Sequence, residues 1–277
     1  MPADFGKTFS SAFKYAFAFR RILPFFLINL ILVAFIFIFI DSATNLLPLL
    51  VSNAWSSIPI STILYATLIF LAVIAVTTLM RIFFQATITD NARFYWQKKK
   101  KGLSKSFPTG RKYITVLFAL ILAGIISSFV SAILQYIPIG GVFLAMIASI
   151  LLGLIFLFLI QIIVISNKGV VNSLKEGYRL FMRNKLDVFL FWLVLIILSL
   201  LILLVAIIPI LIAAVPIIGL LIESVTAGSA ILENLIPLIK SNMLSLGIAS
   251  IISSLILAYM SVFQESAKTF FYMQKKK

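Results

Sequence analysis

The chain has 277 residues, of which 62% are hydrophobic and 11% are charged, and its formal net charge is +15. Neither Cys nor His occurs, which excludes disulfides, thiolate or imidazole metal sites and histidine-dependent catalysis. Several apolar runs reach the roughly 20 residues that a helix needs to cross the hydrocarbon core of a bilayer. The chain contains no polar stretch long enough to form a separate soluble domain. The sequence therefore predicts an all-α polytopic membrane protein with a single membrane domain over residues 1–277.

Residues 4–21 predict an amphipathic helix that lies in the membrane interface. One edge carries phenylalanines at four-residue steps and another carries cations at seven-residue steps, and both spacings keep to one helical face. We expect the Phe edge to face the acyl chains and the cations to face the headgroups. Pro24 follows where a helix can begin. The two edges are Phe5, Phe9, Phe13 and Phe17, and Lys7, Lys14 and Arg21.

Six apolar runs predict six spanning helices, over about residues 22–40, 61–80, 113–137, 142–165, 186–211 and 243–263. The second run continues without Gly or Pro toward Lys101, so its helix should protrude from the membrane. Outer connections are expected at residues 41–61, at Pro138–Gly141 and between Pro209 and Pro216. Residues 220–239 are interpreted as an outer interfacial or re-entrant helix, and a seventh crossing stays open.

Two stretches share the spacing Ser-x4-Tyr-x4-Arg directly before an apolar run, and a looser third copy precedes another run. The segments that follow the second and sixth helices, residues 94–100 and 271–277, also match. Such periodicity predicts three repeated hairpins, each with an amphipathic leading helix, in units of about 1–101, 102–168 and 169–277. The copies are Ser10, Tyr15 and Arg20; Ser173, Tyr178 and Arg183; and Ser104 followed by Arg111, Lys112 and Tyr113.

The distribution of Lys and Arg predicts the topology. Of 23 such residues, 22 fall within residues 1–21, 81–112, 166–185 and 264–277, and Lys240 alone lies elsewhere. Positive charge accumulates on the cytoplasmic side of membrane proteins. We therefore expect both termini in the cytoplasm and a location in a plasma or inner cell membrane.

Polar side chains near the inner ends of the helices are candidates for an inner vestibule, because ionisable groups inside a membrane are costly unless they are paired or wetted. The alternative is that they lie at headgroup depth and pair or snorkel. Asn29 and the serines of the third and sixth helices similarly mark either a polar path or interhelical hydrogen bonds. The vestibule candidates are Arg81, Gln85, Asp90, Gln161, Gln264 and Glu265.

The basic segments are candidates for contact with anionic lipids or with a protein partner, since each cation near an anionic leaflet contributes about 1 kcal/mol. Phe94–Trp96 beside Lys98–Lys101 combine cations with stacking aromatics, which single-stranded nucleic acid also favours. Aromatic belts with flanking lysines are equally typical of membrane interfaces. The contact candidates are Lys7, Lys14, Arg20, Arg21, Lys98, Lys99, Lys100, Lys101, Lys175, Arg179 and Arg183.

No phosphate-binding glycine loop, HExxH motif or carboxylate pair inside a spanning run points to catalysis, so we predict no enzymatic activity and no cofactor or metal. The function expected is a membrane scaffold or a subunit of a larger complex with a basic cytoplasmic face. Further membrane or cytoplasmic subunits are the expected partners. The alternative is a channel or permease component of a transport machine, including one that moves a polyanion such as DNA.

The segment Gly169–Leu195, GVVNSLKEGYRLFMRNKLDVFLFWLVL, together with the order of helices and turns, resembles one family. It is similar to the six-helix membrane domain that anchors some glycerophosphodiester phosphodiesterases and to its stand-alone prokaryotic relatives of unknown function. The phosphodiesterase domain and its histidines have no counterpart in this chain. The resemblance implies a membrane module without that activity.

Overall fold

The computed structural model describes residues 3–51, 60–138, 140–226, 238 and 240–276. Within these residues the regular structure is helical, with no strand. Six helical segments are long and apolar enough to cross a membrane, which confirms the all-α polytopic architecture expected from the sequence. They are Phe19–Ile40, Ser61–Trp96, Gly110–Gln135, Gly141–Ser166, Lys185–Gly219 and Met243–Lys275.

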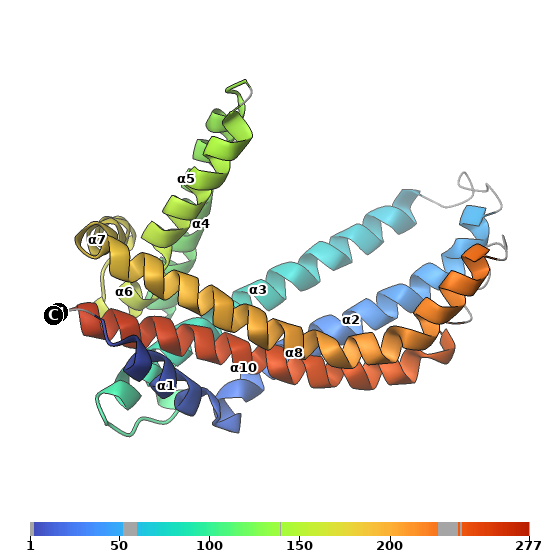
Figure 1. Ribbon diagram of the computed structural model, residues 1–277, viewed down its shortest axis with the longest axis horizontal. Coiled ribbons are helices and arrows are strands. Elements are labelled where there is room, and N and C mark those ends of the chain that lie inside the picture. The colour runs from blue at the N-terminus through green and yellow to red at the C-terminus, as the bar shows by residue number, and fades with distance from the viewer. Residues whose placement is uncertain (1–2, 52–59, 139, 227–237, 239, 277) are drawn as a thin grey trace. The chain divides into compact units, whose positions relative to one another are not determined.

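Figure 1 shows the helices along the chain. They are α1 (Phe5–Ala16), α2 (Phe19–Val51), α3 (Ile60–Trp96), the short 3-10 helix η2 (Ser104–Ser106), α4 (Gly110–Gln135), α5 (Gly141–Phe156), α6 (Leu159–Ser166), α7 (Val170–Arg183), α8 (Lys185–Thr226) and α10 (Met243–Lys275).

The chain forms two compact units that share long helices. Unit 1 contains residues 1–22, 82–199 and 261–277, and unit 2 contains residues 23–81 and 200–260. Helices α3, α8 and α10 each contribute one part to either unit, and nearly all of α2 belongs to unit 2. Unit 1 contains 21 of the 23 Lys and Arg residues, so the basic segments of all three hairpins belong to the same unit.

Unit 1 has an aromatic core, and α1 contributes to it. Phe9 stacks on Phe191 of α8 at 5.5 Å between ring centroids, and Phe13 lies 4.4 Å from Phe263 of α10. Phe5 similarly lies 6.2 Å from Phe271. The expectation that this Phe edge faces the acyl chains is therefore wrong, because aromatic rings of α8 and α10 cover it. Only Phe17 at the end of the edge is largely exposed, at 74%.

Helices α4 and α5 form an antiparallel hairpin through the predicted turn, of which Ile139 lies outside the described residues (Figure 1). At Gly141 an added Cβ atom would lie 2.3 Å from the carbonyl oxygen of Leu134, so this close approach requires glycine. The fourth predicted spanning helix is interrupted between α5 and α6. The interruption places Phe158 in the aromatic core, 5.4 Å from Phe271.

Helix α7 follows α6 through Asn167, which adopts the left-handed conformation at φ 55°. Its buried residues are Ser173, Gly177 and Leu180, whereas Tyr178 is half exposed. The close contact of this helix is made by Gly177. A Cβ atom on Gly177 would lie 2.7 Å from the carbonyl oxygen of Ile155 in α5, so the helix backbones approach closely at this point.

In unit 2 buried polar groups connect the helices. Asn29 of α2 donates from Nδ2 to the carbonyl oxygen of Ser254 in α10 at 3.1 Å, and its Oδ1 accepts from Arg81 of α3 at 2.9 Å. Ser253 donates to the carbonyl oxygen of Ala206 in α8 at 2.6 Å. These contacts correspond to the interhelical alternative for Asn29 and for the serines of the last helix.

Several helices extend beyond the predicted boundaries. Helix α2 begins at Phe19, five residues before Pro24, and continues to Val51 through the first part of the predicted outer loop. Helix α8 continues through Pro209 and Pro216, where an outer turn was expected, to Thr226. Proline is tolerated inside spanning helices because neighbouring groups satisfy the freed carbonyls. The rest of both predicted outer segments, residues 52–59, 227–237 and 239, lies outside the described residues.

Candidate functional site

The basic groups of unit 1 gather where α3, α6 and α10 end and where α4, α7 and α8 begin; we call this region the basic end (Figure 1). Ser166 of α6 and Tyr272 of α10 share a hydrogen bond of 2.7 Å, and Lys275 of α10 pairs with Asp187 of α8. Arg93 of α3 donates to the carbonyl oxygen of Ile165 in α6 at 3.4 Å. The described helix ends are thus joined directly by polar contacts.

Tyr15 of α1 organises one side of the basic end. Its ring is fully buried, and its hydroxyl donates to Asn91 Oδ1 on α3 at 2.7 Å. The Nδ2 group of Asn91 in turn donates to the carbonyl oxygen of Lys101 at 2.8 Å and to Ser106 Oγ at 3.3 Å. These bonds hold the connection between α3 and α4 against α1, because breaking one would leave a buried polar group unsatisfied.

Arg21 lies over this tyrosine. Its guanidinium is 3.8 Å from the centroid of the Tyr15 ring and donates to the Tyr15 carbonyl oxygen at 2.6 Å. Burial raises the pKa of the Tyr15 phenol well above its ordinary value of about 10, and the positive charge of Arg21 opposes that shift. Arg21 was expected to contact anionic lipid or a protein partner. In the structure its guanidinium lies against aromatic rings of the protein, because it is also 5.3 Å from the centroid of the Tyr95 ring.

A groove of about 530 Å³ lies where α1 meets the end of α3; we call it the lysine groove. Trp96 stands in it, stacked on Phe270 at 5.0 Å, and Lys7 lies 5.3 Å from the Trp96 ring. Two residues after the end of α3, Lys98 adopts the left-handed conformation at φ 58°. This end keeps the three lysines beside the tryptophan. The groove is lined by Lys7, Ser11, Tyr95, Trp96, Lys98, Lys99 and Lys100.

The conformation at Lys98 follows from the hydrogen bonds of the helix end. Lys98 donates its N–H to the carbonyl oxygen of Tyr95, and Lys99 donates to that of Phe94, both at 2.9 Å. This pair of bonds is a Schellman motif, in which glycine usually occupies the left-handed position. A lysine there is less favourable by about 1 kcal/mol. The chain therefore keeps the first of four consecutive lysines at a position that backbone geometry would assign to glycine.

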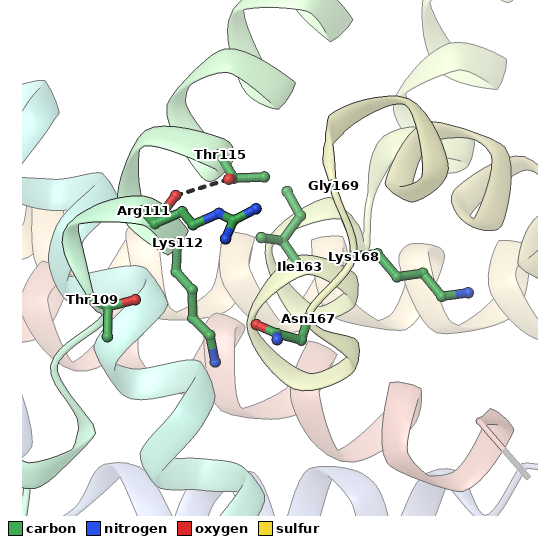
Figure 2. A pocket seen from close by; sticks show the side chains of 8 residues that line it. All are labelled: Thr109, Arg111, Lys112, Thr115, Ile163, Asn167, Lys168 and Gly169. Carbon is green, nitrogen blue, oxygen red and sulfur yellow. Dashed lines mark hydrogen bonds between the residues drawn. The ribbon is translucent and has the colours of Figure 1, made fainter.

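A second cavity, of about 360 Å³, lies between the start of α4 and the connection from α6 to α7; we call it the α4–α7 pocket. Figure 2 shows Arg111 and Lys112 extending from α4 toward that connection, while Lys168 extends away from them. Lys168 pairs with Glu176 of α7 at 3.1 Å. The lining residues are Thr109, Arg111, Lys112, Thr115, Ile163, Asn167, Lys168 and Gly169.

The predicted vestibule residues enter several separate contacts. Gln161 of α6 donates to Glu265 Oε2 of α10 at 3.0 Å, and Lys268 pairs with Glu265 Oε1 at 2.9 Å. Asp90 pairs with Lys101 at 2.5 Å. Gln264 donates to Ser199 Oγ at 2.8 Å. Gln85 is half-buried on α3. Arg81 belongs to unit 2, where it donates to Asn29. Of the six, only Gln161 and Glu265 contact each other directly among the described hydrogen bonds.

The buried pair is incompletely satisfied. Both residues are 1% exposed, and Gln161 Oε1 has no hydrogen-bond partner in the described part of the chain. Buried polar atoms are almost always bonded to protein or to water. Gln161 and Glu265 therefore form a buried, incompletely satisfied polar pair inside the spanning segments.

The remaining predicted contact cations are exposed. They project from α1, from the start of α2 and from α7, and none forms an ion pair within the described residues. Lys276 shows the local excess of positive charge: burial lowers the pKa of this lysine, and Arg93 and Lys168 lower it further. The exposed cations are Lys14, Arg20, Lys175, Arg179 and Arg183.

Sequence reasoning placed Arg111 and Lys112 in the third basic segment but did not place them among the contact residues. The looser match of that segment to the other two was the only signal for them. Asn91 was missed, and Asn167 was not predicted to line a site. A single Asn inside or after a long apolar run does not indicate which helix it will meet; here Tyr15 of α1 donates to Asn91, and Asn167 lines a cavity with residues from the start of α4.

In comparisons with known proteins, no family model, curated protein or solved structure matches the chain.

Proposed function

We propose that the protein is a multi-pass scaffold of a cell membrane, with its basic end at the cytoplasmic leaflet, where it binds anionic headgroups and an acidic protein partner. One observation carries this proposal: the carboxylates of unit 1 are already engaged. Asp4 caps α1, and the other four each pair with a lysine. These four pairs are Asp90–Lys101, Glu176–Lys168, Asp187–Lys275 and Glu265–Lys268.

The cations left over need an external counter-charge. Unit 1 contains 21 Lys and Arg residues against five carboxylates, so the internal pairs neutralise only a minority of the positive charge. Exposed cations beside a spanning helix are attracted to anionic lipids by about 1 kcal/mol each. Lys98, Lys99 and Lys100 beside Trp96 combine this charge with a ring suited to the headgroup level. A surface of this kind supports stable orientation in the membrane and contact with an acidic partner.

The proposal is tested by gentle extraction of the tagged protein from its native membrane, followed by mass spectrometry of the molecules that remain bound. A scaffold should retain anionic lipids and a partner in fixed stoichiometry. Neutralising Lys98, Lys99 and Lys100 to Gln should release them while the protein stays folded. Retention of zwitterionic and anionic lipids in the ratio of the surrounding membrane would contradict the proposal.

The buried Glu265 favours a second candidate, a channel or permease component, including one that carries a polyanion. Ionisable groups inside spanning segments often line a path for ions or substrate. Glu265→Gln separates the two functions, because it removes a charge from the buried pair and leaves every exposed cation in place. A conduit should lose flux through reconstituted vesicles, whereas the scaffold should keep its lipids and its partner.

A further inference from the structure

We infer that the α4–α7 pocket is a binding site for a phosphomonoester group, built from Arg111, Lys112, Thr109 and Asn167. The inference rests on the proposed function and deepens it, since it assigns one headgroup chemistry to one cavity of the basic end.

The charge in the pocket is available to a ligand. Within the described residues Arg111 and Lys112 form no ion pair, and the third lining cation, Lys168, is held by Glu176 at 3.1 Å. Figure 2 shows the Arg111 and Lys112 side chains reaching from α4 toward Asn167 and Gly169. A guanidinium offers planar paired donors and an ammonium offers a point charge, and both are typical ligands of phosphate.

Neutral donors complete the pocket. Thr109 precedes α4 with extended backbone, but its side chain forms no capping hydrogen bond. The Asn167 amide likewise has no hydrogen-bond partner within the described residues. Asn167 directly follows α6, and its side chain lines the cavity. Both groups line the same 360 Å³ space as the two cations. They would donate to phosphate oxygens without adding competing negative charge.

The backbone around the pocket also favours negative charge. Gly169 directly precedes α7, and like Thr109 before α4 it provides no side-chain cap, so the first N–H groups of both helices lack such a partner. Partial positive charge at helix N-termini adds to that of the cations. The cavity is therefore positive from two helices and from two side chains.

A phosphomonoester suits this site better than a phosphodiester. Its second pKa is near 6, so at pH 7 it carries between one and a half and two negative charges and presents three acceptor oxygens. A phosphodiester carries one charge and has two free oxygens. The pocket lies at the ends of spanning segments Gly110–Gln135 and Gly141–Ser166, where headgroups are found. The ligand is thus either a lipid with a phosphomonoester headgroup or a soluble phosphomonoester.

The test measures binding of the purified full-length protein to mixed micelles that contain phosphatidic acid, phosphatidylglycerol or phosphatidylcholine. Arg111→Gln with Lys112→Gln removes two charges from the pocket, and Lys98→Gln with Lys99→Gln removes two from the lysine groove. We expect the pocket variant to bind phosphatidic acid about 30-fold more weakly, with a much smaller loss for phosphatidylglycerol. The groove variant should weaken both anionic lipids by similar factors.

Two further measurements test the chemistry of the site. Asn167→Gly removes the amide but suits the left-handed backbone, and it should lower the affinity for phosphatidic acid several-fold without changing net charge. Lowering the pH below about 6 should reduce the preference for phosphatidic acid over phosphatidylglycerol, because the phosphomonoester gains a proton.

Glycerol 3-phosphate distinguishes the two sources of the ligand. Affinity equal to that of phosphatidic acid assigns the site to a soluble phosphomonoester, and much weaker binding assigns it to a lipid. Equal losses in the pocket and groove variants would overturn the pocket assignment and leave the proposed function standing. If the wild-type protein does not prefer either anionic lipid to phosphatidylcholine, the proposed function fails as well.

Discussion

The Ser-x4-Tyr-x4-Arg spacing occurs at residues 10–20, from α1 into the start of α2, and at residues 173–183 in α7, yet the structure uses the two tyrosines differently. Tyr15 of α1 is fully buried and bonded to Asn91, whereas Tyr178 of α7 is 50% exposed. The serines are reversed, since Ser10 is exposed and Ser173 is buried. A repeated sequence therefore specifies a helix beside a membrane but not the face that the helix buries.

The difference follows from the neighbours that each helix meets. Helix α1 packs through its phenylalanines on α8 and α10, and this orientation turns Tyr15 inward. Helix α7 approaches α5 through Gly177, and this contact leaves the next residue, Tyr178, at the surface. Burial of the repeated tyrosine is thus a consequence of tertiary packing.

The largest expected effect separates the two tyrosines. Tyr15→Ala should lower the free energy of unfolding by about 3–5 kcal/mol, because it removes a buried ring and leaves Asn91 Oδ1 without its donor. Tyr178→Ala should change it by less than about 0.5 kcal/mol. Chemical unfolding in detergent micelles, followed by tryptophan fluorescence, measures both variants. Equal effects would show that the two helices are packed alike.

The next effect separates the glycines of the two helices. Gly177→Ala should destabilise the protein by about 1–3 kcal/mol, because the new Cβ atom would meet the Ile155 carbonyl oxygen at 2.7 Å. Gly6→Ala in α1 is the matched control, since its nearest neighbour is Asp4 Oδ1 at 3.6 Å. We expect that control to be neutral or slightly stabilising, as alanine is the better helix former. A tolerated Gly177→Ala would mean that α5 and α7 do not pack closely.

A pH titration sharpens the comparison further. Burial raises the pKa of Tyr15 above its unfolded value, so the folded state binds more protons than the unfolded state above about pH 10. Its contribution to stability should be complete below pH 10 and should decrease as the pH rises beyond it. Tyr15→Phe should remove this part of the pH dependence, and Tyr178→Phe should retain it. If the free energy of unfolding depended on pH in the same way for the wild-type protein and both variants, a buried phenol at position 15 would be excluded.

The smallest effect concerns the arginines of the repeat, which have the same exposure in both copies, at the start of α2 and at the end of α7. Arg20 and Arg183 are both exposed. Either one changed to Gln should weaken binding to phosphatidylglycerol vesicles about fivefold and leave unfolding within about 0.5 kcal/mol of wild type. Vesicle flotation at two salt concentrations measures this, because screening should reduce the difference. A loss of stability without a loss of binding would assign these arginines to packing.

Much of the fold follows from the sequence, because apolar length and charge distribution are local properties. Helix α3 continues past its apolar run to Trp96, as predicted, and α10 begins at Met243, where the sixth spanning helix was predicted to begin. The boundaries of α2 and α8 do not match the prediction, since a proline ends a helix in water but is tolerated where neighbouring helices satisfy the freed backbone groups. The pairing of Gln161 with Glu265 spans 104 positions and depends on how α6 lies against α10. No local pattern contains that information.

The candidate site follows the same division. The sequence identifies the cations of the basic end, but only the structure shows which of them are already neutralised. Arg21 and Lys101 were predicted to contact anionic lipid; the structure places Arg21 on Tyr15 and pairs Lys101 with Asp90. Within the described residues Arg111 and Lys112 form no ion pair, and the acids of unit 1 are engaged elsewhere. Such pairing depends on geometry that the order of residues does not express.

The most direct test of the central claim is native mass spectrometry of the protein in bilayer discs that contain equal amounts of phosphatidylglycerol and phosphatidylcholine. Wild-type protein should retain phosphatidylglycerol selectively after the disc is stripped away. The variant with Gln at positions 98, 99, 100, 111 and 112 should remain folded and retain phosphatidylglycerol with a much smaller preference. Equal retention of the two lipids by the wild-type protein would contradict the account, because the unpaired cations of the basic end would then have no anionic lipid as their ligand.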